Sequence, residues 1–270
     1  MYLDQISQLL KQASQIAKKN FGKIVTSETK KTDNNQVLTQ TDLEIGKYLV
    51  DQIKVIFEGY NIIDEEAGVI DNKSRFTWTV DPIDGTSNFA NGIPTYGIIL
   101  GLLDENKPIA GGIALPSFDS IYVAESGKGA FLGNKQISCT KENNLLNSLI
   151  SYGIDGHQEE PSLTHRETKI LSNIILGIRN LRTSNSAYDF ALVADGRYGA
   201  YLNQTSKIWD NVGAQILIEE AGGIYTDFYG NPMDYQNPIS KARANFTYCA
   251  ASSELHAQLQ SIINLQGVTL

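Results

Sequence analysis

The sequence predicts an α+β protein made of layered helices and sheets rather than a barrel. Two amphipathic helical segments come first, near residues 2–20 and 42–58. Residues 60–140 then consist of short β-type runs separated by Gly, Pro, Asn and Asp, a pattern typical of an antiparallel sheet. Beyond residue 140 helices and strands are mixed without strict alternation, which disfavours a barrel of repeated βα units.

The two N-terminal helices are predicted from apolar residues at helical spacing. The segment TDLE opens the second helix, because Thr41 and Glu44 have the spacing of a capping box. The apolar positions are Leu3, Ile6, Leu10, Ala13 and Ala17 in the first helix, and Leu43, Leu49, Val50, Ile53, Ile56 and Phe57 in the second. We therefore expect one face of each helix to pack on a core.

A polar stretch, CTKENNLLNS at residues 139–148, is the best candidate for a domain boundary. It divides the chain into a predicted N-terminal α+β subdomain, residues 1–145, and a C-terminal α/β subdomain, residues 146–270. The elements expected after the boundary are strands near 149–154 and 199–203 and helices near 162–177, 187–196 and 209–223. Paired glycines end the last of these helices, as is usual for a helix C-terminus.

Composition and charge exclude several classes of protein. The 270 residues carry 30 acidic and 22 basic side chains, and the net charge of -8 makes nucleic acid an unfavourable partner. No apolar run approaches the about 18 residues of a membrane span, and the first residues lack the pattern of a secretion signal. Cys139 and Cys249 lack the spacing of a zinc site and are expected to be inert, buried thiols. We therefore expect a cytoplasmic protein.

Three acidic features stand out along the chain. Glu65 and Glu66 follow an apolar run in IIDEEAG, Asp81 and Asp84 lie in DPIDGT, and Asp210 opens an apolar helix in IWDNVG. Acidic residues at such places commonly cap free N–H groups and complement a helix dipole. Taken alone, Asp210 and the glutamate pair are better explained in that way. The two aspartates of DPIDGT are harder to explain so, because repulsion and desolvation both disfavour them at the end of a buried strand.

The DPIDGT segment predicts a cation site next to an anion site. Pro82 fixes φ and removes a donor, so the strand is expected to stop there, and Gly85 frees the backbone at a helix start. The turn would point both aspartates and the Ile83 carbonyl in one direction, and such hard oxygen ligands suit Mg²⁺. The first N–H groups of the helix beginning at Gly85 and Thr86 would attract an anion. Metal-assisted phosphate-ester chemistry needs this combination.

Charge balance favours the same interpretation. Together, Glu65, Asp81, Asp84 and Asp210 would bring a charge of about -4 into one pocket at neutral pH. Two or three Mg²⁺ ions would offset that charge and leave capacity for a phosphate dianion. Without metal, the carboxylates would be held apart or partly protonated.

The segments DPIDGTSNF, IIDEEAG and WDNVGAQILIEEAGG resemble the inositol monophosphatase family of Mg²⁺-dependent, Li⁺-sensitive phosphatases. The segment ALPSFDSIYVAESGKGAFLGNKQI is similar to the middle hairpins of that family, so the resemblance spans nearly the whole chain. It implies an αβαβα layered sandwich, a homodimer, and a site between two subdomains. It also implies hydrolysis of a small polyol phosphate by metal-activated water, without a covalent phosphoenzyme.

The resemblance assigns the ligands of two or three Mg²⁺ ions per site. Glu65, Asp81 and the carbonyl of Ile83 would bind the first ion. Asp81, Asp84 and Asp210 would bind the second ion, and a weaker third ion would use Glu65 and water.

The resemblance also implies catalytic and substrate-binding residues. Thr86, helped by Asp42, would orient the attacking water together with Glu65, although Asp42 also suits a dipole-complementing residue in a first helical turn. The backbone N–H groups of Gly85 and Thr86 would hold the phosphate. Lys31 falls near a basic position of the family, and equally suits a solvated loop. The remaining substrate-binding residues would be Asp84, Asn185, Ala187, Asn203 and Asp210.

Three positions depart from the family pattern. Asp64 stands where Gly, Ser or Ala is common, so it would either perturb the third metal or point away. Asn203 stands where inositol phosphatases have a glutamate that hydrogen-bonds ring hydroxyls, and Asn185 replaces a usual glycine. Losing a hydrogen-bonding partner changes which substrate a site prefers. The sequence therefore supports the hydrolysis of a phosphate ester better than it supports inositol as the alcohol part of that ester.

Several alternatives stay open. Within the family they are a histidinol phosphatase, a fructose-1,6-bisphosphatase, and a nucleotide or broad-specificity phosphatase. From another class, the chain could be a regulatory binding protein on the same fold, but a catalytically silent relative would be expected to lose a ligand position and none is lost. The three histidines, His157, His165 and His256, are expected at the surface.

Overall fold

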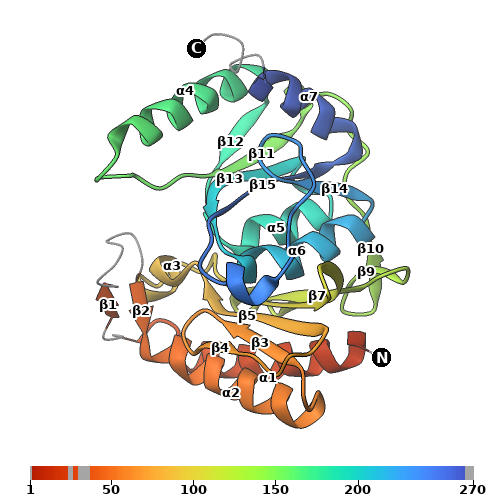
Figure 1. Cartoon of the computed structure of the whole chain (residues 1–270). Helices are drawn as coiled ribbons and strands as arrows, with labels where there is room; N and C mark the ends of the chain where they lie inside the picture. The colour runs from red at the N-terminus through yellow and green to blue at the C-terminus, as the bar shows by residue number, and fades with distance from the viewer. Residues whose placement is uncertain (1, 24–26, 30–36, 265–270) are drawn as a thin grey trace.

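The computed structural model describes residues 2–23, 27–29 and 37–264. Helices and sheets alternate in five layers, which confirms the predicted layered α+β fold (Figure 1). Helices α1 and α2 cover one face of a large sheet, α5 and α6 lie between the two large sheets, and α4 and α7 cover the far face of the second sheet (Figure 1). The helices are α1 (Tyr2–Asn20), α2 (Gln40–Ile56), α3 (Thr86–Ala90), α4 (Pro161–Gly177), α5 (Ala187–Ala194), α6 (Ile208–Glu220) and α7 (Ser253–Asn264).

The first large sheet has eight strands in the order β10-β9-β8-β7-β6-β5-β3-β4. Its neighbours pair antiparallel, as predicted, except that β3 runs parallel to β5. The antiparallel prediction was wrong for this pair because side-chain alternation shows that a strand exists but not which strand it joins. The strands are β3 (Asn61–Asp64), β4 (Gly68–Ile70), β5 (Phe76–Asp84), β6 (Gly97–Asp104), β7 (Lys107–Leu115), β8 (Ser120–Glu125), β9 (Gly129–Leu132) and β10 (Lys135–Ile137).

The second large sheet has five strands in the order β12-β11-β13-β15-β14, with β11 parallel to both of its neighbours. The segment predicted as a boundary, 139–148, lies between the last strand of the first sheet and the first strand of the second. The strands are β11 (Leu149–Gly153), β12 (Asn180–Arg182), β13 (Ala200–Ser206), β14 (Gly223–Thr226) and β15 (Phe246–Ser252). A separate pair, β1 (Ser27–Thr29) and β2 (Val37–Thr39), was not predicted.

Helix α2 begins two residues earlier than predicted. Its N-cap is Thr39, whose Oγ1 accepts from the N–H of Thr41 at 3.2 Å, and the N–H of Thr39 donates to Asp42 Oδ2 at 2.9 Å. The predicted capping box of Thr41 and Glu44 was therefore wrong. Two overlapping Thr-x-x-acid patterns satisfy the same spacing here, and the chain leaves the extended conformation of β2 at the first of them.

Three glycines bring helix α6 into backbone contact with the first sheet. A Cβ atom at Gly101 would lie 2.6 Å from the backbone nitrogen of Gly213, and one at Gly111 would lie 2.7 Å from its Cα atom. A Cβ atom at Gly213 itself would overlap the carbonyl oxygen of Leu100. Any side chain at these positions would push α6 away from β6 and β7. The glycines therefore fix the distance between α6 and the sheet.

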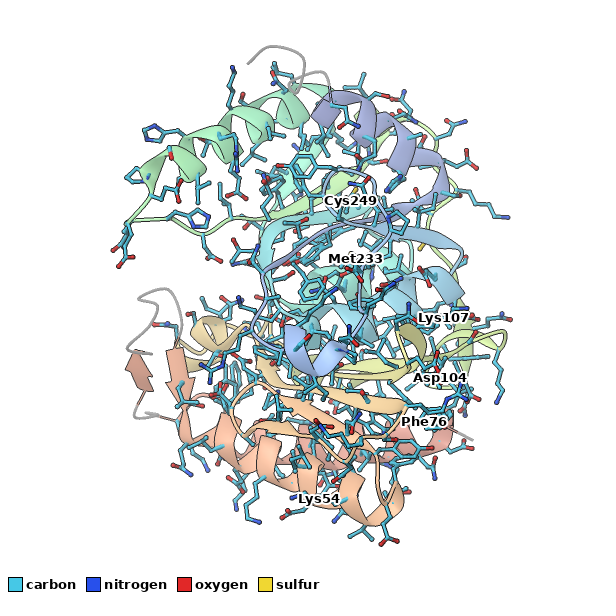
Figure 2. The ribbon with its side chains drawn as sticks, in the orientation of Figure 1. Lys54, Phe76, Asp104, Lys107, Met233 and Cys249 are labelled. Atoms are coloured by element: carbon cyan, nitrogen blue, oxygen red, sulfur yellow. The ribbon has the colours of Figure 1, made fainter. Side chains whose placement is uncertain are left out.

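Side chains fill the space between the layers, and Cys249 lies among them (Figure 2). Cys139 and Cys249 are free and buried, as predicted, and burial raises the pKa of each to about 12. The surface prediction for His256 was wrong: its ring is buried and its Nε2 atom lies 2.9 Å from Thr226 Oγ1. Its polar helical context gave no sign of this partner on β14. Among the described residues, no helix is long and apolar enough to cross a membrane.

The carboxyl group of Glu167 should make stability depend on pH. Glu167 is buried on α4, and burial raises its pKa to about 7. The folded state binds this proton more tightly than the unfolded state does. The protonated Glu167 therefore makes its full contribution to the free energy of unfolding below about pH 4.5, and this contribution is lost as the pH rises through 7. Replacing Glu167 with Gln should remove this dependence and stabilise the protein at pH 8 by about 1–2 kcal/mol. Urea unfolding of both proteins at pH 5 and pH 8 measures it, and parallel pH profiles would contradict it.

Candidate active site

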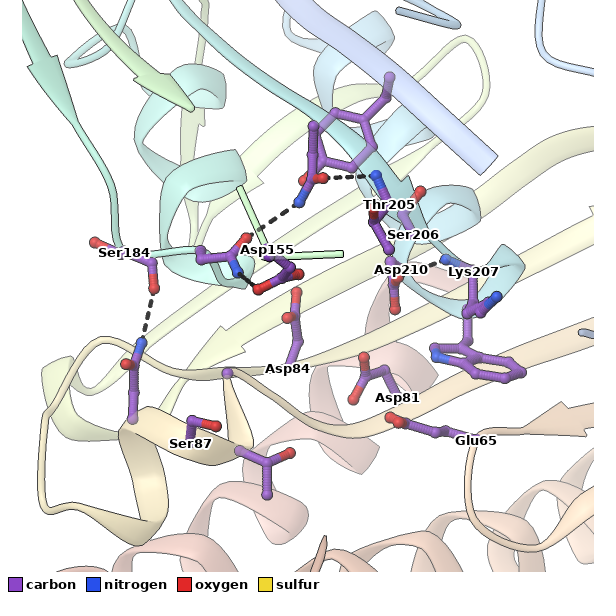
Figure 3. Close-up of a pocket in the computed structure, with 18 of the residues that line it drawn as sticks. Glu65, Asp81, Asp84, Ser87, Asp155, Ser184, Thr205, Ser206, Lys207 and Asp210 are labelled. Atoms are coloured by element: carbon purple, nitrogen blue, oxygen red, sulfur yellow. Dashed lines mark hydrogen bonds between the residues drawn. The ribbon is translucent and has the colours of Figure 1, made fainter. Parts of the chain in front are cut away.

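A cleft of about 630 Å³ is lined by residues from both halves of the chain. Four carboxylates point toward one another at its floor (Figure 3). Glu65 follows β3, Asp81 and Asp84 lie on β5, and Asp210 lies in the first turn of α6. The structure thus brings together the four acidic residues that the sequence singled out, from elements that are up to about 145 positions apart in the chain.

A β-bulge places both aspartates of DPIDGT on the same side of β5. Asp81 pairs with Ile99 and Asp84 pairs with Gly97, so three steps on β5 match two on β6. In a regular strand, residues three apart point to opposite faces, and one extra residue restores a common face. The strand therefore runs through Pro82 rather than stopping there, which corrects the prediction. Proline is tolerated at a bulge because no ladder hydrogen bond is required of it.

The carboxylates oppose one another electrostatically. Burial raises the pKa of Asp81, and the charges of Glu65, Asp84 and Asp210 raise it further. Burial, Asp210 and Glu65 likewise raise the pKa of Asp84, while the N–H of Ala187 acts in the opposite direction. A bound cation would relieve this repulsion, because it stabilises the charged form of every neighbouring carboxylate.

The donor set fits a hard divalent cation. Within the described residues, the Oδ1 atom of Asp81 is buried without a hydrogen-bonding partner. The residues available as ligands are Glu65, Asp81, the carbonyl of Ile83, Asp84 and Asp210, all of which line the cleft. Over that same described part of the chain, no three His, Cys, Asp or Glu side chains are arranged to hold one ion by themselves. Mg²⁺ usually keeps several waters and binds one or two carboxylates, so it does not require such a cage.

Thr86 and Asp42 form a pair beside the carboxylates. Thr86 Oγ1 lies 3.1 Å from Asp42 Oδ1 and 2.8 Å from the carbonyl oxygen of Ile83. Asp42 is almost fully buried, and burial raises its pKa to about 6 against the hydrogen bonds from Thr39. It does not line the cleft itself but contacts Thr86 from behind and also caps α2. Both interpretations of Asp42 are therefore compatible with its position.

Gly85, which is predicted to bind phosphate, lies where the N-terminal half of the chain contacts the C-terminal half. Its φ of 91° lies in the left-handed region, and a Cβ atom there would lie 2.7 Å from the Cβ of Ser186. Asn88 strengthens the join, since its Nδ2 donates to the carbonyl of Ser184 at 2.8 Å. Ala187, predicted to bind substrate, is fully buried and does not line the cleft; its N–H faces Asp84 instead.

The two asparagines that depart from the family pattern, Asn185 and Asn203, are hydrogen-bonded to each other in the wall of the cleft. Asn203 Nδ2 donates to Asn185 Oδ1 at 3.1 Å, and Asn185 Nδ2 donates to Asp155 Oδ1 at 3.3 Å. Asn185 has a φ of 53°, which explains why a glycine suits this position and why asparagine is tolerated. Asp155 was not predicted, because the segment DGHQEE has the composition of a solvated loop.

Other lining residues were also missed by the sequence. Lys207, the residue before α6, also lines the cleft, and no sequence pattern marked it as a site residue. Asp64 does not line the cleft: its Oδ1 accepts from the N–H groups of Glu66 and Ala67 at 2.9 and 2.5 Å. Lys31 lies outside the described residues. Further unpredicted lining residues include Ser87, Asn88, Gly156, His157, Glu159, Tyr201, Thr205, Ser206, Trp209 and Tyr248.

Comparison with known proteins identifies relatives of this chain. A protein named fructose-1,6-bisphosphatase/inositol-1-monophosphatase from Aquifex aeolicus is 28% identical over 235 residues, covering 85% of this chain and 86% of that protein. A Nus factor SuhB from Xylella fastidiosa is 29% identical over 232 residues, 84% of this chain and 83% of that protein. The solved Thermotoga maritima IMPase superposes with a TM-score of 0.84 at 26% identity, covering 98% and 97% of the two chains. Because the sequence profile of the inositol monophosphatase family matches residues 2–264, the chain belongs to that family.

Proposed function

We propose that this protein is a Mg²⁺-dependent phosphomonoesterase that releases phosphate from a small polyol phosphate. The observation that carries the proposal is the convergence of Glu65, Asp81, Asp84 and Asp210 on one cleft beside Thr86. A polar cleft of about 630 Å³ accommodates a phosphorylated sugar or polyol. Membership of the inositol monophosphatase family supports the same reaction class.

The chain's own residues would act as follows. Glu65 and Thr86 would orient a water molecule for in-line attack on phosphorus, with Glu65 taking its proton. The bond from phosphorus to the alcohol oxygen would break in the same step, and the departing alkoxide would take a proton from solvent water. Asp42 and the Ile83 carbonyl hold the Thr86 hydroxyl at 3.1 and 2.8 Å, so its direction is fixed before substrate binds. The N–H groups of Gly85 and Thr86 would hold phosphate oxygens. Mg²⁺ bound to the carboxylates would polarise the phosphoryl group and lower the pKa of the attacking water.

A regulatory role is the second candidate, and the similarity to a protein named Nus factor favours it. All residues implied as metal ligands are nevertheless present and gathered in the cleft. We therefore propose catalysis as the primary function, in a cytoplasmic homodimer. Sensitivity to Li⁺ belongs to the same proposal.

The test measures phosphate release from inositol, fructose, histidinol and nucleotide phosphates. Each ester is assayed once with Mg²⁺ at about 5 mM, enough to load the site, and once with EDTA. We expect turnover of at least one polyol ester with Mg²⁺ and a loss of about 100-fold or more in EDTA, because one cation supplies several kcal/mol to the transition state. Circular dichroism in EDTA is the control for folding. Turnover that is equal in both buffers would contradict the metal dependence, and no turnover of any ester would favour the regulatory role.

A further inference from the structure

The part of the cleft wall that holds Asn185 and Asn203 also holds a carboxylate, that of Asp155. Position 203, where the resemblance to the family implies a glutamate that binds ring hydroxyls, is a neutral asparagine here. We propose that Asp155 supplies the missing carboxylate and recognises a hydroxyl group on the alcohol part of the substrate. This inference rests on the proposed function and names the specificity-determining residue of the same site.

The hydrogen bonds around Asn203 lead to Asp155. Asn203 Oδ1 accepts from the N–H of Thr205 at 2.7 Å, which fixes the amide so that its Nδ2 faces Asn185. The Oδ1 of Asn185 accepts that bond, so the Nδ2 of Asn185 faces Asp155. The chain of donors therefore runs in one direction and ends on a carboxylate. Two neutral amide side chains thus connect the buried Asn203 by hydrogen bonds to the carboxylate of Asp155, which lines the cleft.

The backbone places these side chains together. Gly153 on β11 pairs in register with Asn203 on β13, and Asp155 follows two residues later. A Cβ atom at Gly153 would overlap Asn185 Oδ1 and lie 2.5 Å from Asn203 Nδ2, so the glycine leaves space for the amide pair. Asp155 lines the same cleft as Asp84, and Figure 3 labels both residues. The carboxylate therefore faces the space that a substrate in the cleft would occupy.

The chemistry of the site selects the ligand class. A carboxylate accepts hydrogen bonds from hydroxyl groups, and charged acceptors form stronger bonds than neutral ones. A site built to pair with a hydroxyl rejects analogues that lack it. Asp155 therefore suits a polyol or sugar monophosphate with a free hydroxyl near the ester. An ester with a flat, hydroxyl-free leaving group would gain nothing from it.

The direct test is Asp155→Asn, which keeps an oxygen acceptor for Asn185 and so preserves the fold. We expect KM for inositol phosphate or fructose bisphosphate to rise about 10-fold or more with little change in kcat, because the lost contact is present before and during reaction. The increase for p-nitrophenyl phosphate should be several-fold smaller. Glu159→Gln, which removes a charge from the exposed rim of the same cleft, is the matched control for a general field effect.

The double variant Asp155→Asn/Asn203→Glu provides a swap experiment. If Asp155 does the work of the missing glutamate, restoring a carboxylate at 203 should recover most of the lost polyol preference. A merely structural role of Asp155 would give no such rescue. Asn203→Glu alone should raise activity on inositol phosphate relative to esters without hydroxyls.

Calorimetric binding of inositol phosphate to the wild type and to D155N separates this inference from the proposed function. If the wild type binds inositol phosphate tightly without turning it over, and D155N binds it more weakly, the proposed enzymatic function is overturned and the role of Asp155 is supported. Normal turnover with the same KM in D155N would overturn Asp155 and leave the enzyme standing. A larger loss for histidinol phosphate, which bears an ammonium group, than for the polyol esters would also overturn it, because Asp155 would then select a cation.

Discussion

Replacing Asp84 with Asn should lower phosphate release on the order of 1,000-fold, with the fold intact. The change removes the charge of a proposed metal ligand that lines the cleft, and it preserves the shape of the side chain. A neutral amide binds Mg²⁺ far less well than a carboxylate, and metal stabilisation of the transition state is worth several kcal/mol. Steady-state rates with saturating Mg²⁺ and substrate measure the effect.

The same variant should gain stability in EDTA. Burial and the charges of Asp210 and Glu65 disfavour the ionised form of Asp84, so its removal relieves repulsion in the metal-free protein. We expect a Tm increase of roughly 3 °C at pH 8 without metal. Asp104→Asn, at the far end of β6 and paired with Arg75 at 2.6 Å, is the control carboxylate. Full activity of D84N, or a fall in its metal-free Tm, would contradict the assignment of Asp84 as a ligand.

Replacing Gly213 with Ala should destabilise the protein by about 3 kcal/mol and reduce its activity together. The added methyl group would overlap the carbonyl oxygen of Leu100, which cannot move without breaking the sheet. Overpacking of a close backbone contact typically costs 1–3 kcal/mol, roughly, and occasionally more. Helix α6 would shift away from β6, and Asp210 would move with it. Urea unfolding and phosphate release on the same preparation measure both effects.

Gly46→Ala is the matched control, since Gly46 is also a helical glycine. A Cβ atom there would lie 3.1 Å from Asp64 Oδ2 and 3.2 Å from Pro82 Cγ, contacts that neighbours can relieve by small shifts. Its effect should be below about 1 kcal/mol, because the helix propensity of alanine offsets part of the crowding. A G213A protein as stable as the wild type would show that the helix and the sheet can separate without cost.

The sequence predicted the elements whose signals are local. The span of α1 follows from its apolar spacing, and α4, α5 and α6 lie within a few residues of their predicted limits. Asp81 and Asp84 were singled out because Pro82 and Gly85 make DPIDGT an unusual sequence for a strand end, whereas Glu65 and Asp210 were assigned through the resemblance to the family. Even there, the bulge that aligns Asp81 and Asp84 was not predicted, because it depends on the register with β6.

Features that depend on distant partners were not predictable. The parallel pairing of β3 with β5 and the burial of His256 against β14 both require knowledge of which elements meet. Asp155 belongs to the same category: its loop has an ordinary solvated composition, and only the pairing of β11 with β13 brings it near Asn203. The roles of the individual ligands stay predictions that the variants above test.

The contact of α6 with the first sheet also has a consequence for the order in which the protein folds during its synthesis. The eight-stranded sheet is complete at residue 137, whereas α6 ends at residue 220. A nascent chain emerging from the ribosome can pair its first strands early, since domains fold from the N-terminus as they appear. Until α6 emerges, the face formed by Ile99 and Ile113 lacks the longer of the two helices that cover it, and the acidic floor lacks Asp210. Catalytic competence should therefore appear late in translation, in one step, as the helix docks on its glycines.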